Sequence, residues 1–401
     1  MPRSSNDRQR GSGRRDRQAL AGGEQSGAMD TAARKVRIGI SGSYGGMNLG
    51  DEAILEGILG ELRASVPAEV TVFSRNPADT LARHKVEHAI NVRALTRKEA
   101  TPVIRKLDLF VLGGGGILFD GEAEAYLREV LIAHEAGVPV MVYAISAGPL
   151  ASRTSRLAVR DALNAAPRTV ITVRDRQGLR LLEDVGVTQE VHLTADPAFL
   201  LEPEALPVEA LKAEGLDLEG HVVGFSVREP GPAAPDIDPE QYYALLANAA
   251  DFVVERFGAE VVFVPMEKFD VQHSHGVVAH MRFPERAEIL RRRYSSRQIL
   301  DLMGRFDFAV GMRLHFLIFA ALRGTPFSAL PYASKVSGLM EDLGMDTPPL
   351  GSIGIGELIG RIDRKWDMRK EIRAQIGERV PALRARAKLT GESLLGLLPQ
   401  K

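Results

Sequence analysis

Short runs of β-branched and aromatic residues alternate with longer amphipathic stretches along most of this 401-residue chain. Five such runs come first: VRIGI, VTVFS, LDLFVLGG, VPVMVYAI and TVITV. The stretches between them, such as YLREVLIAHEAG, repeat apolar residues at helical spacing. Strands and helices that alternate in this way form a parallel sheet with helices on both faces. The pattern therefore predicts an α/β fold.

The same alternation starts again after a polar, proline-containing segment. HVVGFSVREP, EVVFVPM, FDFAVGM and PFSALPY supply the strands of this second series. Two doubly wound, Rossmann-like sheets bind ligands where the carboxyl ends of their strands face a cleft. The predicted organisation is a disordered basic tail (1–33), an amino-terminal domain (34–203), a linker (204–220), a carboxyl-terminal domain (221–368) and a helical segment interrupted by Pro381 (369–401).

Composition excludes several kinds of protein. The chain has no cysteine, which rules out disulfides, thiolate metal sites and cysteine nucleophiles. Its 51 basic and 52 acidic residues give no overall attraction to nucleic acid or to an anionic membrane. No apolar run approaches the roughly 18 residues of a membrane span. We expect a cytoplasmic protein, or one at the inner face of the membrane, that uses neither a metal nor a cofactor.

The turn after the first strand carries glycines and carboxylates. GISGSYGGMNLGDEAIL places Asn48 as a helix N-cap, with Asp51 and Glu52 in the first turn of the helix. Negative charge there repels a second anion but suits sugar hydroxyls, so Asp51 is a candidate general base. The alternative for Glu52 is a capping box that only stabilises the helix. The glycines that let a ligand approach this turn include Gly45 and Gly50.

A second glycine run follows a buried strand, in LDLFVLGGGGILFD. Such a run indicates that a ligand lies close to the backbone, and a tight contact between domains is the alternative. The segment VYAISAGPL ends another strand with small residues, and we expect a similar close approach at its glycine. The candidate residues of these loops are Gly114, Gly115, Gly116 and Gly148.

The segment GMRLHFLIFAALRGTP begins an apolar helix with two polar residues, Arg313 and His315. The free N–H groups of a helix start and a guanidinium without an acidic neighbour predict a site for a phosphate or carboxylate. His315 can add a hydrogen bond or transfer a proton. A buried histidine bonded to the backbone is the alternative for His315. Arg228, at the end of the first strand of the second series, is a further candidate for binding an anion.

Two other basic clusters call for a simpler interpretation. His273, His275 and His280 have no carboxylate pattern that completes a known metal site, so we predict no metal there. The consecutive Arg291, Arg292 and Arg293 point in different directions, which favours solvated side chains.

These segments together resemble the polysaccharide pyruvyltransferase family. The resemblance extends from about residue 36 to 345 and rests on six motifs: G-x-x-N-x-G-D-E-A-I at 45–54, the glycines at 113–116, A-G-P at 147–149, V-R-D at 173–175, D-P at 196–197 and G-M-R-L-H at 311–315. It implies a fold of the glycosyltransferase B type. It also implies the transfer of pyruvate from phosphoenolpyruvate onto a sugar of a cell-surface polysaccharide or its precursor, as a cyclic ketal.

The resemblance implies roles for particular residues. Arg313, Leu314 and His315 would bind or activate the donor, and Arg228 or Lys335 would hold its second anionic group. His315 is the candidate acid. Where many relatives read Y-D-P-K-V, this chain has YASKV at 332–336, so no role is assigned to Ser334. The expected partners are phosphoenolpyruvate and a glycan or lipid-linked saccharide.

Two other functions remain open at this stage. A nucleotide-sugar glycosyltransferase of the same fold would need a carboxylate for the ribose near 335–341, and Glu341 is available. A non-catalytic sugar-binding protein would need neither Arg313 nor His315 for more than stability. The apolar LLGLL near the carboxyl end suggests helix packing, with a weak peripheral membrane contact as the alternative.

Overall fold

A computed structural model describes residues 34–165, 168–216, 218–229, 238–330, 334–346 and 354–398. The basic tail predicted over 1–33 lies outside these residues, as do Tyr332 and Ala333. Both predicted sheets are present, and the domain boundaries given above stay predictions.

The amino-terminal half folds around one sheet in which every pairing is parallel. The strand order is β3-β2-β1-β4-β6-β7-β8, and β5 pairs with the end of β6. The strands are Val36–Ser41 (β1), Ala68–Phe73 (β2), His88–Ile90 (β3), Leu109–Leu112 (β4), Gly115–Leu118 (β5), Val140–Ala147 (β6), Thr169–Val173 (β7) and Val191–Leu193 (β8).

Helices cover both faces of this sheet, because successive strand residues point to opposite sides. In β4, Val111 packs in the apolar cluster that contains Ile54 of α1, whereas Leu112 packs in the cluster that contains Val130 of α4. The helices are Leu49–Ser65 (α1), Pro77–His84 (α2), Arg97–Ile104 (α3), Ala123–Glu135 (α4), Arg153–Asn164 (α5) and Arg176–Val185 (α6), with 3-10 turns at Val92–Ala94 and Pro197–Leu200.

The carboxyl-terminal half repeats the architecture with a smaller parallel sheet in the order β11-β10-β9-β12-β13. Its strands are Val222–Ser226 (β9), Glu260–Phe263 (β10), Ala287–Ile289 (β11), Phe308–Gly311 (β12) and Phe327–Ala329 (β13). Its helices are Val208–Lys212 (α7), Pro239–Phe257 (α8), Lys268–Ala279 (α9), Ser296–Met303 (α10), Leu314–Arg323 (α11), Ser334–Asp342 (α12), Ile355–Asp367 (α13) and Arg369–Leu395 (α14), with a 3-10 turn at Pro284–Arg286.

The strand order reverses between β1 and β4 in the first sheet and between β9 and β12 in the second. Crevices for ligands lie at such reversal points. Helix α1 follows β1 and helix α11 follows β12, so both helices begin at these points, and the two helices contact each other. The N–H of Leu49 also donates to the carbonyl of Met266, 2.8 Å away, which joins the start of α1 to the segment after β10.

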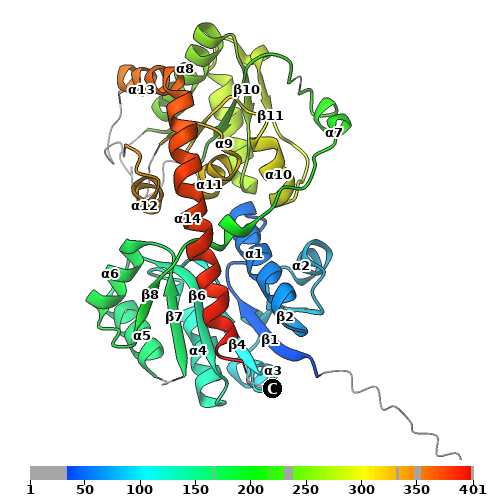
Figure 1. Cartoon of the computed structure of the whole chain (residues 1–401), viewed down its shortest axis with the longest axis vertical. Coiled ribbons are helices and arrows are strands. Elements are labelled where there is room, and N and C mark those ends of the chain that lie inside the picture. The colour runs from blue at the N-terminus through cyan, green and yellow to red at the C-terminus, as the bar shows by residue number, and fades with distance from the viewer. Residues whose placement is uncertain are drawn as a thin grey trace, which may run out of the picture. The chain divides into compact units, whose positions relative to one another are not determined.

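Helix α14 packs against elements of both halves, among them α11, α13, α1 and β6 (Figure 1). It continues through Pro381, so the predicted interruption at this residue is wrong. The LLGLL segment lies at its end, where Leu394 is 1% exposed and belongs to the core of the first sheet. The apolar character of Leu394 is therefore explained by the packing of α14 against the first sheet. Among the described residues, no helix is both long enough and apolar enough to cross a membrane.

Candidate functional site

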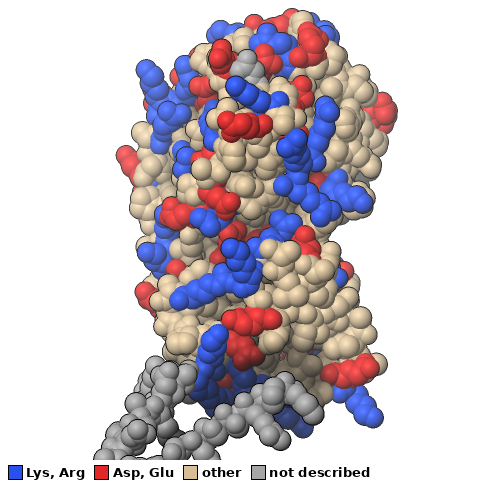
Figure 2. All heavy atoms as spheres, turned by 90° about the vertical axis from the view of Figure 1, so that its right-hand side faces the viewer, with Lys and Arg blue, Asp and Glu red and all other residues tan. Residues whose placement is uncertain are grey.

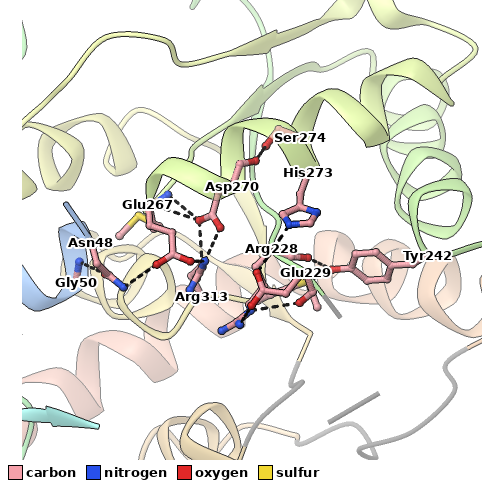
Figure 3. Close-up of polar contacts among 12 residues, drawn as sticks. Asn48, Gly50, Arg228, Glu229, Tyr242, Glu267, Asp270, His273, Ser274 and Arg313 are labelled. Atoms are coloured by element: carbon pink, nitrogen blue, oxygen red, sulfur yellow. Dashed lines mark hydrogen bonds and ion pairs between the residues drawn. The ribbon is translucent and has the colours of Figure 1, made fainter. Parts of the chain in front are cut away.

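Asn48 caps helix α1 as predicted and also joins the two halves of the chain. Its side-chain oxygen accepts the N–H of Gly50 at 2.9 Å, which satisfies a free donor of the first turn. Its amide nitrogen donates to Oε2 of Glu267, 3.2 Å away at the start of α9 (Figure 3). The cap therefore fixes the start of α1 relative to the carboxyl-terminal half.

Glu52 faces the protein interior. Its carboxylate accepts the N–H of Gly45 at 2.9 Å and pairs with Nε2 of His84 at 2.7 Å, and the residue is 1% exposed. Gly45 has a φ of +74°, and a side chain there would overlap Ser74, so only glycine fits this turn. Glu52 and Gly45 therefore hold the glycine turn, and their contact with a sugar stays a prediction.

Asp51, the neighbour of Glu52, lines an open hollow of about 990 Å³, part of which is open to solvent; we call it the central hollow. Burial raises the pKa of Asp51, and the positive charges of His315, Lys335 and Arg174 oppose this rise. A carboxylate with a raised pKa is better matched to proton transfer near neutral pH than an ordinary one. The central hollow is lined by Ser43, Asn48, Asp51, Arg75, Gly116, Phe119, Glu122, Arg174, Met266, Arg313, Leu314, His315 and Lys335.

His315 lies between the two halves, with its ring against Gly50. A Cβ atom on Gly50 would overlap Nδ1 of His315, so the glycine makes room for the ring. On the other side, Nε2 lies 3.4 Å from Oδ2 of Asp196, an ion-pair distance. Nε2 is buried and has no hydrogen-bond partner in the described part of the chain. The contacts with Gly50 and Asp196 thus fix the ring where the two halves meet.

Asp196 also forms a buried ion pair with Arg174, whose Nη1 lies 2.6 Å from Oδ2 of Asp196. Burial favours a neutral carboxyl at Asp196, but Arg174 and His315 outweigh this effect and hold its pKa well below the usual range. Asp196 is therefore a fixed negative charge beside the imidazole of His315, and it orients the ring.

Arg313 is the N-cap residue of α11 and is held by two carboxylates of α9. Its guanidinium hydrogen bonds to Glu267 and to Asp270, with Nε 3.0 Å from Oδ2 of Asp270 (Figure 3). The expectation of a guanidinium without acidic neighbours is wrong, because the chain brings these carboxylates from 46 and 43 residues away. Arg313 and Leu314 still form part of the wall of the central hollow.

Arg228 lies apart from the lining of the central hollow. Its guanidinium bonds to the Glu229 carboxylate, and its carbonyl accepts the hydroxyl of Tyr242 at 2.7 Å. Burial raises the pKa of Glu229, but the charge of Arg228 outweighs this and lowers it. In this arrangement the positive charge of Arg228 is paired with the carboxylate of Glu229. A role of Arg228 in holding the donor stays a prediction.

Lys335, near the start of α12, lines the central hollow and makes no hydrogen bond or ion pair with the described residues. Its positive charge acts to lower the pKa of Asp51. Glu341, the carboxylate that a nucleotide-sugar enzyme would need, lies 3.7 Å from Arg176, with its side chain 62% exposed, and does not line the hollow.

The second glycine run is explained mostly by packing inside the first half. A side chain on Gly113 would overlap the hydroxyl of Tyr44, and one on Gly114 would lie 2.9 Å from Ile54 and 3.1 Å from the carbonyl of Tyr143. Gly115 begins β5 with a φ of +100°. Of these four glycines only Gly116 lines the central hollow, and the contact of the run with a ligand stays a prediction.

Gly148, like Gly113, Gly114 and Gly115, is not part of the lining of the central hollow. It has a φ of +104°, and a Cβ atom there would lie 2.7 Å from Leu181. Two of the three histidines predicted not to bind a metal, His273 on α9 and its C-cap His280, have separate partners. His273 bonds to the hydroxyl of Tyr243 at 2.8 Å, and His280 lies 3.0 Å from Glu240. Among the described residues, no group of three or more His, Asp or Glu side chains is arranged to hold a metal ion.

Comparison with known proteins identifies the family. The family model for "Polysaccharide pyruvyl transferase" matches residues 48–334. The chain belongs to this family. The "Amylovoran biosynthesis protein AmsJ" of Erwinia amylovora is 22% identical over 300 residues, which is 71% of this chain and 71% of that protein. The chain is thus an enzyme of the pyruvyl transferase family, and the match begins at the N-cap residue Asn48.

Solved structures that resemble this pyruvyl transferase family member show the fold. A putative UDP-N-acetylglucosamine 2-epimerase from Listeria monocytogenes has a TM-score of 0.62 at 11% identity, covering 90% of this chain and 95% of that chain. Anabaena Alr3699/HepE, solved in complex with UDP and glucose, has a TM-score of 0.58 at 15% identity, with 90% and 98% covered. The predicted glycosyltransferase B type fold is confirmed.

Four residues around the site were missed by sequence reasoning. Arg174 and Asp196 stand in the V-R-D and D-P motifs, directly after or close to the ends of β7 and β8, where polar residues of a parallel sheet gather. That position is the signal that could have marked them. Glu267 and Asp270 follow β10 in the same way, with a spacing that places both in the capping box of α9.

Proposed function

We propose that this chain transfers pyruvate from phosphoenolpyruvate onto two hydroxyls of one sugar in a cell-surface polysaccharide or its precursor, forming a ketal. The observation that carries the proposal is the meeting of His315, Asp51 and Lys335 in the central hollow. His315 comes from the carboxyl-terminal half and Asp51 from the amino-terminal half, so a donor and an acceptor bound there would lie between an acid and a base.

The donor carries a phosphate and a carboxylate, which together need more than one cation. Lys335 supplies a charge that no described carboxylate neutralises through an ion pair, and Arg75 and Arg174 line the same hollow. The N–H groups at the start of α11 add a partial positive charge. Arg313 and Leu314 form the wall there, and Glu267 and Asp270 fix the guanidinium. We therefore assign the donor to the side of the hollow that α11 and α12 form.

Ketal formation requires a balanced transfer of protons. A proton is added to C3 of the enol, which becomes the methyl group, and an acceptor hydroxyl oxygen bonds to C2 as it loses its own proton. A second hydroxyl of the same sugar then bonds to C2, the bond between C2 and the phosphate oxygen breaks, and the second proton leaves with inorganic phosphate. The reaction thus needs an acid near C3 and a base near the hydroxyls, each worth on the order of 10²–10⁴-fold in rate.

His315 is suited to the acid role, because it lines the central hollow and Asp196, 3.4 Å from Nε2, orients its ring. Asp51 is suited to the base role, because burial raises its pKa and it faces the same hollow. Because the two groups come from different halves of the chain, movement of one half relative to the other would change their separation. Closure around the reactants would also keep water from the reactive intermediate.

A ligand-binding test separates this function from that of a nucleotide-sugar enzyme. Thermal unfolding is measured with phosphoenolpyruvate, UDP and GDP in turn, with the wild type and with Lys335→Met. A ligand at one hundred times its Kd stabilises the folded state by about 2.7 kcal/mol. We expect a rise in melting temperature with phosphoenolpyruvate only, and its loss in Lys335→Met. Lys98→Met, at an exposed lysine on α3, is the control that keeps the shift.

The activity test follows phosphate release in the presence of phosphoenolpyruvate and a panel of glycans. Release that needs both substrates, and that falls at least 10²-fold in His315→Ala, supports the proposal. A melting-temperature shift with a nucleotide and none with phosphoenolpyruvate would replace it with the nucleotide-sugar function. No phosphate release by the wild type with any substrate would indicate a non-catalytic protein, and equal release by wild type and His315→Ala would exclude His315 as the acid.

A further inference from the structure

A second hollow, with about 840 Å³ of empty space, adjoins the central hollow. We call it the arginine hollow, because its lining contains five basic residues and one acidic residue, Glu267. The acidic residue is already bonded to Arg313 and Asn48. Figure 2 shows Lys and Arg side chains gathered on this side of the molecule. The five basic residues are Arg83, Lys268, Arg291, Arg292 and Arg293.

The backbone of the three consecutive arginines is fixed by a buried carboxylate. Glu214, which is 6% exposed, accepts the N–H groups of Arg291 at 3.0 Å and of Arg292 at 2.9 Å. It also accepts the hydroxyl of Tyr294 at 2.9 Å. Three hydrogen bonds to one buried carboxylate fix the backbone of this segment, while the arginine side chains are exposed to solvent, as predicted.

The guanidinium groups of these arginines are only weakly paired. Their nearest acidic oxygens lie at 3.8, 3.9 and 4.0 Å, at the outer limit of an ion pair. Their side chains are 57–73% exposed. Exposed ion pairs at such distances contribute little free energy, so an incoming anion can replace them. An oxyanion bound between these guanidiniums gains charge-assisted hydrogen bonds instead.

The floor of the arginine hollow is apolar. Met266 and Ile299 are each 1% exposed, Leu290 is 4% exposed and Tyr294 is 8% exposed. Leu49 and Val271 extend this surface. A ligand that fits the hollow therefore combines a dense negative charge, for the rim, with an apolar part, for the floor. Inorganic anions match the first requirement only.

We propose that the arginine hollow binds a phosphate or diphosphate group joined to an apolar group. Met266 lines both hollows, and the hydrogen bond from Asn48 to Glu267 lies beside the boundary between them. The two hollows are therefore neighbours, and we infer that one molecule spans both. If so, the phosphate ester is the charged end of the acceptor, whose sugar reaches the central hollow, and this last assignment rests on the proposed function.

The site is tested by direct binding, which does not depend on pyruvyl transfer. Isothermal titration with geranyl diphosphate, inorganic pyrophosphate and UDP compares an apolar ester, the bare anion and a nucleotide. We expect geranyl diphosphate to bind most tightly. Its Kd should rise at least tenfold in the triple variant Arg291→Ser, Arg292→Ser, Arg293→Ser. Arg256→Ser is the matched control, because Arg256 is 53% exposed on α8 and lies outside both hollows.

Each other outcome has a definite meaning. Equal affinity of wild type and triple variant for geranyl diphosphate would overturn the site, and so would tighter binding of UDP. Loss of binding in Lys335→Met but not in the triple variant would place the ester in the central hollow and also overturn it. An unchanged melting temperature of the triple variant shows that the fold is intact. The phosphoenolpyruvate shift in that variant should stay the same, which separates this site from the donor site.

Discussion

The imidazole of His315 lies against Gly50 so closely that a Cβ atom on Gly50 would overlap its Nδ1. Gly50 is in the first turn of α1 and His315 is in the first turn of α11, so the contact joins the two halves of the chain at the candidate site. Glycine in a helix costs about 1 kcal/mol relative to alanine. The room that it leaves for the histidine ring is a physical reason for its presence.

Replacing Gly50 by alanine should therefore damage activity more than stability. The added methyl group pushes the ring of His315 away from its position beside Asp196, and a displacement of about 1 Å can reduce a rate on the order of 10²-fold. Gly60→Ala is the control, because Gly60 is exposed on the same helix and nothing lies within 4 Å of an added Cβ. It should raise stability by up to about 1 kcal/mol at unchanged activity. Full activity in Gly50→Ala, measured as kcat/KM, would contradict this role.

The ion pair between Arg174 and Asp196 leads to a second prediction. Asp196→Asn leaves the buried guanidinium without its partner at 2.6 Å, which should cost about 3–5 kcal/mol of unfolding free energy in a urea titration. Adding Arg174→Met to that variant removes the unpaired charge and should restore much of the stability. Activity should stay low in the double variant, because His315 still lacks its carboxylate. Recovery of activity together with stability would show that Asp196 acts on the fold alone.

The positions of several site residues could be read from the sequence. Asp51 and His315 both follow a buried strand at the start of a helix, and the carboxyl ends of parallel strands gather at one edge. Asn48 as the N-cap follows from its side chain and from the carboxylates after it. Local chemistry of this kind depends on neighbours in sequence, which is why it could be predicted.

Other parts of the site depend on contacts between distant segments. Neighbouring residues on a helix point about 100° apart, so the rotation of α1 decides that Asp51 faces the hollow and Glu52 the core. The carboxylates that hold Arg313 come from α9, and no pattern around Arg313 announces them. The glycines at 113 and 114 make room for Tyr44 and Ile54, which the sequence does not show to be neighbours.

The titration of Asp51 offers a third test. Because burial raises the pKa of Asp51 and the charge of Lys335 opposes that rise, Lys335→Met should move this pKa further upward. The carboxyl signal of Asp51, followed by NMR across pH 3–8 and assigned with Asp51→Asn, measures both values. In a pH profile of kcat/KM, a base with a raised pKa loses activity as the pH falls through that pKa. A lower Asp51 pKa in Lys335→Met would contradict the arrangement of charges in the hollow.

Glu129 provides a prediction about stability that does not involve the site. The residue is fully buried on α4 and hydrogen bonds to the Ser41 hydroxyl at the end of β1. Burial raises its pKa from 4.5 to about 7, whereas Arg128, 3.6 Å away, opposes the rise. A raised pKa in the folded state means a stabilising contribution that is complete below pH 4.5 and lost as the pH rises through 7.

Glu129→Gln should remove this pH dependence, because the amide has nearly the same shape but does not titrate. A shift of this size corresponds to about 3 kcal/mol, so above pH 7 the variant should be the more stable protein. Unfolding free energies measured from pH 5 to 8 test this, and Glu135→Gln, at an exposed residue of the same helix, is the control that keeps the wild-type slope. If wild type and Glu129→Gln lose stability in parallel over this range, Glu129 is already ionised in the folded protein, and the buried position must hold a charge that Arg128 stabilises.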